Sequence, residues 1–267
     1  MILSYDGTAY LGWQACNVGP SIEETLTGVL EKVLRQKVTL QAASRTDAGV
    51  HAEGQVVNFF LEKPRDFNQL KKCLNQLLPK DIRVNHIEEA TETFHPTLDA
   101  KGKEYHYHLS LGRVQLPFVR HFAWHYPFPL DLEKMKTAAS FFLGEHDFSA
   151  LGNITFPEPK CSRRTLFRIE LIPENEMLRF EVEGDHFLYK MVRNIVGTLV
   201  YVGAGKLSLE EVANLLESRD RKKAGMTAPA HGLTLKRVFY KKDSLGKCDA
   251  SSRFSLKKRD FQHFSPT

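Results

Sequence analysis

The stretch Ser44-Arg45-Thr46-Asp47-Ala48-Gly49-Val50-His51-Ala52 lies between two strand-like segments. It is longer than an ordinary hairpin turn and carries several functional groups. Gly49 allows a positive φ, so the chain can turn tightly just after Asp47. A guanidinium from Arg45 beside the carboxylate would keep Asp47 ionised, ready to act as a nucleophile or to stabilise charge. On spacing alone, an Asx-type turn with a surface ion pair is the simpler interpretation.

Around this stretch, the first hundred residues follow the order β-α-β-β-α-β. The clearest helix runs from Ile22 to Leu34, with apolar residues at the spacing of one buried face. Ser21 and Glu24 form its capping box. A second amphipathic helix covers 67–78 and stops at Pro79, which cannot continue it. The strand-like runs are 2–5, 38–43, 55–61 and 82–88.

The second half has the order β-β-α-β-β-α-α-β. Its strands are expected at 104–111, 122–126, 166–172, 177–183 and 233–240, and its helices at 131–142, 186–202 and 209–216. Two halves of similar rhythm without βαβ crossovers predict an α+β fold with mainly antiparallel sheets joined side by side. The expected units are an N-terminal half (1–100), a C-terminal half (101–243) and a basic tail (244–267).

Positive charge is concentrated at the C-terminal end. The net charge of the whole chain is +5, and residues 219–267 contain thirteen Lys and Arg against four Asp. Such a segment suggests a polyanionic partner, most often nucleic acid, or a solubilising tail. Within it, residues 244–267 are either disordered or an additional arm that binds RNA through basic and aromatic groups.

The sequence lacks the patterns typical of membrane-spanning, exported and cysteine-based zinc or redox proteins. No run approaches the ~18 apolar residues of a membrane span, and the N-terminal MILSYDGT lacks the pattern of an export signal, so the expected location is the cytoplasm. The cysteines stand far apart and none belongs to a C-x-x-C pair, so neither a thiolate zinc site nor a redox dithiol is expected. The cysteines are Cys16, Cys73, Cys161 and Cys248.

Several blocks of sequence combine with the Asp47 stretch into one pattern. They are Tyr5-Asp6-Gly7, Gly12-Trp13-Gln14, Tyr105 and Tyr107 in KEYHYHL, Asp147-Phe148-Ser149, MVRNIVG at 191–197 and AGMTAPAHGL at 224–233. Together with RTDAGVHA at 45–52, they resemble the tRNA pseudouridine synthase A family, whose signature loop carries a catalytic aspartate. Thr97 stands where the family usually has an arginine, which puts one RNA contact in question.

The resemblance implies the pseudouridine synthase fold, in which a central antiparallel sheet spans two related halves with a cleft between them. It implies isomerisation of uridine to pseudouridine in the anticodon arm of tRNA, at positions 38 to 40, with Asp47 as nucleophile. Tyr105 would pack against the target base and Leu233 would line the uracil pocket. A homodimer is expected, and neither a metal nor an organic cofactor. The sequence leaves open whether Asp47 forms an adduct at C1′ or C6, or acts as a base at C2′.

Arg193 is the one charged residue in the apolar stretch 191–205. A charge there must be paired or reach solvent. The expected partner is Asp47, which Arg193 would hold ionised and oriented; the alternative is a side chain that snorkels to the surface. Tyr105 also has a simpler interpretation as a cross-strand packing residue, the role expected for Tyr107.

Two other functions fit some of the same residues. A non-catalytic RNA-binding module on the same fold would have no use for a carboxylate facing a polyanion. A nucleoside hydrolase using Asp47 would ordinarily need a second carboxylate, and none stands at a fixed spacing from it. Arg163 and Arg164, with Lys160, form a basic cluster that contacts phosphates or is simply solvated.

Overall fold

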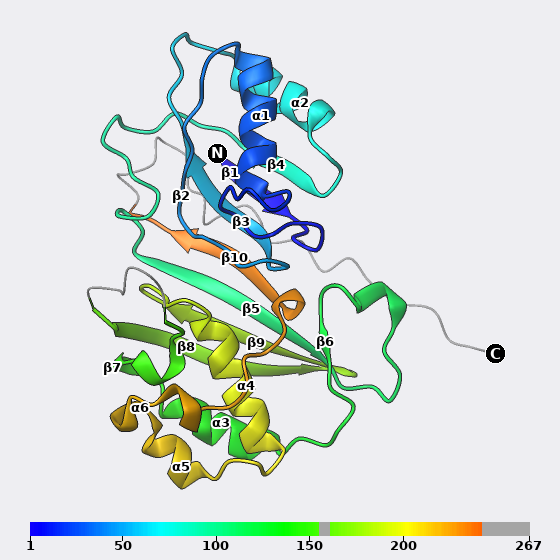
Figure 1. The fold of residues 1–267 in the computed structure, drawn as a ribbon, viewed down its shortest axis with the longest axis vertical. Coiled ribbons are helices and arrows are strands. Elements are labelled where there is room, and N and C mark those ends of the chain that lie inside the picture. The colour runs from blue at the N-terminus through cyan, green and yellow to red at the C-terminus, as the bar shows by residue number, and fades with distance from the viewer. Residues whose placement is uncertain (155–160, 242–267) are drawn as a thin grey trace, which may run out of the picture.

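The structure, a computed structural model, describes residues 1–154 and 161–241 (Figure 1). The strands are β1 (Ile2–Tyr5), β2 (Gln41–Ala42), β3 (His51–Asn58), β4 (Ile82–His86), β5 (Gly102–Ser110), β6 (Trp124–His125), β7 (Gly144–Asp147), β8 (Arg163–Glu174), β9 (Met177–Gly184) and β10 (Leu233–Phe239). The helices are α1 (Ile22–Leu34), α2 (Phe67–Leu77), α3 (Leu132–Ser140), α4 (Met191–Gly203), α5 (Leu209–Ala213) and α6 (Leu215–Ser218). The expected tail at 244–267 and Lys160 lie outside the described residues.

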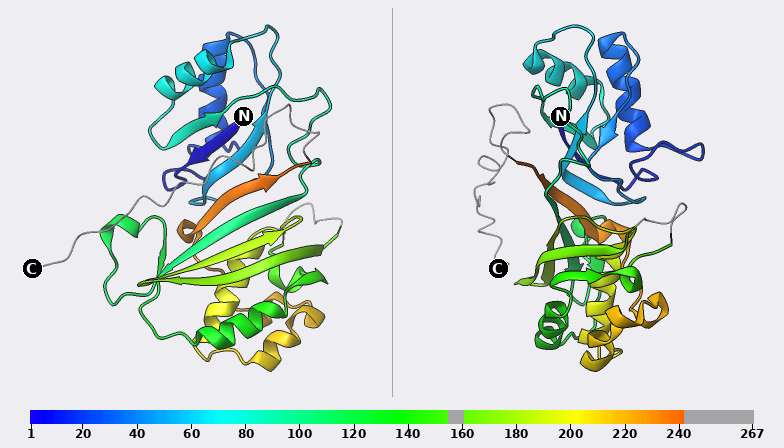
Figure 2. Two further views of the ribbon diagram at one scale, coloured as in Figure 1. Left: turned by 180° about the vertical axis from the view of Figure 1, so that it is seen from behind. Right: turned by 90° about the vertical axis from the view of Figure 1, so that its left-hand side faces the viewer.

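The strands form one continuous sheet, whose main path is β4-β1-β3-β10-β5-β9-β8-β7. Its pairings are antiparallel except for those of β10 with β3 and of β6 with β5. The predicted α+β fold with mainly antiparallel sheets joined side by side is therefore confirmed. The joint is β10, which lies between β3 of the first half and β5 of the second (Figure 2).

The register of β10 brings distant segments of the chain together. On one side Thr234 pairs with His51, at the end of the Asp47 stretch. On the other side Leu233 pairs with Tyr107 and Leu235 with Tyr105. One strand thus places the predicted nucleophile loop next to the predicted base-binding strand.

The interior is a single large apolar core beneath the helices, with a small satellite cluster. The buried face of α1 joins Leu3 of β1, Tyr107 of β5 and Phe180 of β9 in the same core. The Ser21 hydroxyl accepts a hydrogen bond from Glu24 N at 3.2 Å, so α1 begins where the sequence predicts. Among the described residues, no helix is long and apolar enough to cross a bilayer.

Element boundaries differ from the sequence expectation at several places. The predicted strand 38–43 is reduced to β2, and β3 begins at His51 because that end of the loop pairs with β1 and β10. The helix expected from 186 begins at Met191, after Lys190 in a left-handed conformation with φ of 60°. Strand β7 was not predicted, because its four residues are polar or glycine and partly exposed.

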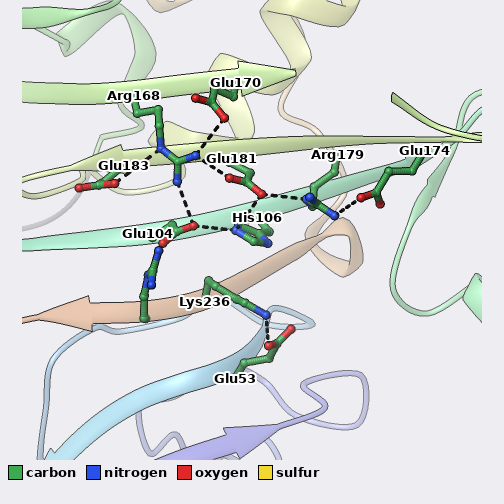
Figure 3. A network of polar contacts seen from close by, with 11 residues as sticks. Glu53, Glu104, His106, Arg168, Glu170, Glu174, Arg179, Glu181, Glu183 and Lys236 are labelled. Carbon is green, nitrogen blue, oxygen red and sulfur yellow. Dashed lines mark hydrogen bonds and ion pairs between the residues drawn. The ribbon is translucent and has the colours of Figure 1, made fainter. Parts of the chain in front are cut away.

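The face of the sheet opposite the core carries a network of charged side chains (Figure 3). Alternate residues of a strand point to opposite faces, so Glu104 and His106 of β5 face away from Tyr105 and Tyr107. A carboxylate oxygen of Glu104 contacts His106 Nε2 at 2.8 Å and Arg168 Nη2 at 3.1 Å. Only 9% of His106 is exposed, so its imidazole lies within the network rather than at the surface.

Glu104 is the most deeply buried acid of this network, and Arg237 pairs with its second oxygen. Burial opposes its ionisation, but hydrogen bonds from His106 and Arg237 outweigh burial and lower its pKa from 4.5 to about 2. Arg168 also donates to Glu181 at 2.6 Å, which links β8, β9, β5 and β10 through charge.

We expect Glu104→Gln to lower the free energy of unfolding at pH 7 by roughly 2–4 kcal/mol, because two arginines lose their buried counter-charge while remaining partly solvated. A folded-state pKa below the unfolded value stabilises the fold above pH 4.5, and this contribution is lost as the pH falls from 4.5 towards 2. Urea denaturation of the wild type and of Glu104→Gln from pH 7 to pH 3 measures this effect. The difference in free energy of unfolding between the two proteins should be constant near neutrality and shrink below pH 4.5.

Glu170→Gln is the control, since Glu170 also pairs with Arg168 but its side chain is 53% exposed. We expect it to change stability by less than about 0.5 kcal/mol. If the difference in free energy of unfolding between the wild type and Glu104→Gln stayed constant down to pH 3, the lowered pKa assigned to Glu104 would be wrong.

Candidate functional site

A cleft of about 600 Å³ opens between the two halves, lined by residues of the Asp47 stretch, of β5 and of the segment before α4. Four of the predicted site residues line it: Arg45, Asp47, Tyr105 and Leu233. Arg193 does not line the cleft but reaches Asp47 from α4. A larger groove of about 1390 Å³ covers the opposite face of the sheet and contains none of these five residues.

The loop that carries Asp47 is anchored by its neighbours in sequence and space. Trp13 N donates to Thr46 O at 3.0 Å, and the hydroxyl groups of Tyr5 and Thr46 share a hydrogen bond of 2.8 Å. Gly49 has a φ of 76°, as the predicted tight turn requires. The loop is therefore positioned by buried side chains rather than left as an exposed turn.

Gln55 holds the beginning of the same loop, and sequence analysis did not single it out. Its side chain donates to Ser44 O at 2.6 Å and accepts from Ser44 N at 3.2 Å. The Ser44 hydroxyl in turn shares a hydrogen bond of 2.7 Å with the Tyr105 hydroxyl. The sequence offers little signal for this role, because β3 also contains His51, Glu53 and Asn58, yet Gln55 is fully buried.

The expected contact between Arg193 and Asp47 is present. Arg193 Nη1 donates to Asp47 Oδ2 at 2.7 Å, and the two side chains are 13% and 15% exposed. Arg193 Nε also donates to Ala228 O at 2.7 Å, which fixes the plane of the guanidinium. Among the described residues, no group donates a hydrogen bond to Asp47 Oδ1, so this oxygen is available to a substrate in the cleft.

The expected contact between Arg45 and Asp47 is not found. Arg45 is exposed, and within the described ranges it forms no ion pair with any acid. The reason is the turn after Asp47, closed by a hydrogen bond from Val50 N to Asp47 O, with the carboxylate directed to Arg193. Arg45 instead places a positive charge on the wall of the cleft.

Tyr105 and Leu233 provide apolar surface beside the carboxylate. The ring of Tyr105 meets Phe187 edge-on, with 5.1 Å between centroids. Burial raises the pKa of Tyr105 to about 12, so its hydroxyl stays protonated near neutrality. Tyr107 is fully buried and donates to Pro229 O at 2.8 Å, which confirms its packing role.

Gly197 explains how the chain around Ala228 comes to lie on α4. A Cβ atom at this position would stand 1.7 Å from Met226 O, so only glycine permits this approach. Ala228 N then donates to Arg193 O at 3.1 Å, in addition to the bond from Arg193 Nε to Ala228 O. The close approach therefore positions the arginine that contacts Asp47.

One group of side chains has the composition of a metal site. Ligand atoms of Glu104, His106 and Glu181 lie within 4.8 Å of one another on the back of the sheet. Guanidinium groups of Arg168 and Arg237 already contact the carboxylates of this group. These contacts explain the cluster as an ion-pair network, and they compete with any cation for the same oxygens.

The family model described as tRNA pseudouridine synthase matches residues 1–97 and 138–241. The chain belongs to the tRNA pseudouridine synthase family. A protein of Protochlamydia amoebophila named tRNA pseudouridine synthase A 2 is 49% identical over 243 residues, covering 89% of this chain and 92% of the relative. Proteins named tRNA pseudouridine synthase A from Acetivibrio thermocellus and Chlamydia muridarum are each 42% identical, covering 90% and 89% of this chain and 98% and 90% of their own lengths.

Membership of the tRNA pseudouridine synthase family makes this chain an isomerase that acts on tRNA. The cleft adds the arrangement that the family motifs produce here: a carboxylate held at one oxygen by Arg193, in a cleft that Tyr105 and Leu233 also line. Thr97, where the family usually has an arginine, lines the cleft and donates to Ala42 O at 2.7 Å.

We expect Gly197→Ala to lower the free energy of unfolding by about 1–3 kcal/mol, because the added methyl group overlaps Met226 O. Turnover should fall at least about tenfold, since the segment that anchors Arg193 must move. Urea denaturation and single-turnover assays on tRNA measure the two effects.

Gly28→Ala in α1 is the matched control, because a Cβ there meets nothing within 4 Å. It should raise stability by about 0.5–1 kcal/mol, as expected for removing glycine from a helix interior, and leave turnover unchanged. Full activity in Gly197→Ala would show that Arg193 does not depend on this contact.

Proposed function

We propose that this protein converts uridine to pseudouridine in the anticodon arm of tRNA, at positions 38 to 40, with Asp47 as the nucleophile. The observation that carries the proposal is the cleft in which Asp47 offers one oxygen to a ligand while Arg193 binds the other at 2.7 Å. The names of the relatives support the substrate class.

The target uridine must leave its stack, because an enzyme that does chemistry on a base cannot reach the reacting atoms inside a duplex. In the cleft, Tyr105 and Leu233 contact the two faces of the base. The exposed Arg45 at the cleft wall binds the RNA backbone rather than the Asp47 carboxylate. Phosphate contacts of this kind make the affinity for tRNA depend on salt.

The reaction is an isomerisation, so the nucleotide gains and loses no atoms overall. The N1–C1′ bond breaks, the uracil turns, a C1′–C5 bond forms, and C5 loses a proton while N1 gains one. Asp47 acts at the ribose or at C6, and the hydrogen bond from Arg193 orients its carboxylate. Since the detached uracil stays bound and becomes the new base, one carboxylate suffices, and no metal or cofactor enters the scheme.

The cleft contains a second carboxylate, which is relevant to the alternative functions of a nucleoside hydrolase and a non-catalytic RNA-binding module. Glu23 is another carboxylate at its wall, and one of its oxygens accepts a hydrogen bond from Ala15 N at 2.9 Å. A hydrolase would use such a pair and release free uracil. A module that only binds RNA would release nothing.

Tritium release from tRNA labelled at C5 of uridine tests the assignment. We expect release by the wild-type protein, none detectable from Asp47→Asn, and similar binding of tRNA by both, because the substitution removes the charge that reacts and little of the binding surface. The readouts are scintillation counting and a filter-binding assay.

Asp131→Asn is the control: Asp131 caps α3 outside the cleft lining, and asparagine also caps well. If Asp47→Asn still released tritium, Asp47 would not be the nucleophile. Free uracil in the wild-type reaction would indicate a hydrolase, and tRNA binding without release would indicate a binding module.

We also propose a cytoplasmic homodimer, in keeping with a tRNA substrate. Large apolar side chains are exposed along the segment between β5 and α3, which projects from the body of the molecule (Figure 1). They are Val114, Leu116, Phe118, Phe122 and Phe128, with exposed fractions from 43% to 92%. Exposed apolar groups gathered in one projecting segment are typical of a surface that a partner covers.

We expect Phe118→Ser to shift the protein from dimer to monomer at micromolar concentration, because Phe118 is the most exposed of these residues at 92%. Sedimentation velocity measures the change. Phe60→Ser, at a residue 78% exposed outside the projecting segment, should leave the dimer intact. A wild-type monomer, or a dimer unaffected by Phe118→Ser, would contradict this interface.

A further inference from the structure

Lys103 is a buried cation in the cleft that the scheme above does not use. It lies on β5 two residues before Tyr105, so both side chains point to the same face of the sheet. Lys103 lines the cleft, yet only 7% of the residue is exposed. Within the described ranges its ammonium group makes neither a hydrogen bond nor an ion pair.

The groups around Lys103 do not supply a counter-charge. Across the strands it pairs with Gly184 of β9 and Val238 of β10, which carry no charge. Burial, and next the positive charge of Arg164, lower its pKa from 10.5 to about 8. Lys103 in turn contributes to the lowered pKa of His186, after burial, which is the larger cause.

The other charged groups near Lys103 do not neutralise its ammonium group. Asp185 raises the pKa of His186, but its Oδ1 accepts hydrogen bonds from Thr165 N and His186 N. Arg164 directs Nη1 to backbone carbonyls, and its buried Nε has no partner among the described residues. The neighbourhood is thus positively charged and faces a cleft.

An unpaired ammonium in such a place destabilises the fold, because it loses hydration and gains no counter-ion. A substrate that carries an anionic oxygen into the cleft would supply the missing partner. Residues i and i+2 on one face of a strand are about 6.6 Å apart, so this oxygen would stand about one base-width from Tyr105.

We propose that Lys103 is a substrate-binding residue, whose ammonium group donates a hydrogen bond to an anionic oxygen of the nucleotide held in the cleft. The inference rests on the proposed function for the identity of that nucleotide. Two oxygens have the required chemistry: a phosphate oxygen flanking the target uridine, and a carbonyl oxygen of the uracil, which becomes anionic once the N1–C1′ bond is broken. Lys103 only donates the hydrogen bond; no covalent bond to it forms or breaks.

Lys103→Met tests the proposal, because methionine keeps most of the volume without the charge. If the ligand is the uracil oxygen, single-turnover tritium release should fall about 10- to 100-fold with tRNA affinity unchanged. If the ligand is a phosphate, the affinity for tRNA should fall about tenfold and the slope of log Kd against log salt should decrease by about 1. In both cases the variant should be at least as stable to urea as the wild type, since an unpaired buried charge is removed.

Lys101→Met is the matched control: Lys101 is exposed and immediately precedes β5, so turnover and affinity should stay within twofold. Lys103→Arg should retain part of the lost function. The proposal is overturned if Lys103→Met keeps both turnover and affinity within twofold, or if it is less stable than the wild type, which would show that the ammonium is paired in the fold. Absence of tritium release by the wild-type protein would instead refute the proposed function.

Discussion

The ion pair between Arg193 and Asp47 is the interaction on which the site depends. Its partners are separated by 146 residues in sequence, one in a loop of the first half and the other in a helix of the second. Because both side chains are largely withdrawn from water, their attraction is less screened than that of a surface pair. The pair therefore orients a reactive group and joins the two halves at the same point. Gly197, Ala228 and the register of β10 all act to bring these two charges within contact.

Strand β5 shows how one segment serves two environments. Lys103, Tyr105 and Tyr107 face the cleft and the core, while Glu104 and His106 face the charged network behind the sheet. A shift of one residue would exchange the two sets. The ion pairs from Glu104 to β8 and β10 are compatible with a single register only. The network thus secures the orientation of the residues on the other face, without taking part in the chemistry.

The order of elements other than β7, and the contact of Arg193 with Asp47, could be predicted from the sequence. Helical and strand periodicities are local, and an isolated charge in an apolar helix needs a partner or access to solvent. Other features depend on tertiary context. Arg45 is near Asp47 in sequence, yet the turn at Asp47 separates their charged groups. Residues 187–190 have a helical apolar pattern but form a wall of the cleft. The burial of Gln55, and the lack of a counter-charge for Lys103 among the described residues, follow from which strands become neighbours, and no spacing rule reports that.

The central place of β10 has a consequence for biosynthesis. Leu233–Phe239 is the last strand of the described chain, but it is hydrogen-bonded on both sides in the middle of the sheet. While the ribosome is still synthesising the preceding residues, β3 and β5 present open edges with unpaired backbone groups. The two halves can collapse separately at that stage, yet they cannot merge into one sheet. Catalytic competence consequently arises only after this strand has been synthesised, and a nascent chain stalled before it is exposed to aggregation through those edges.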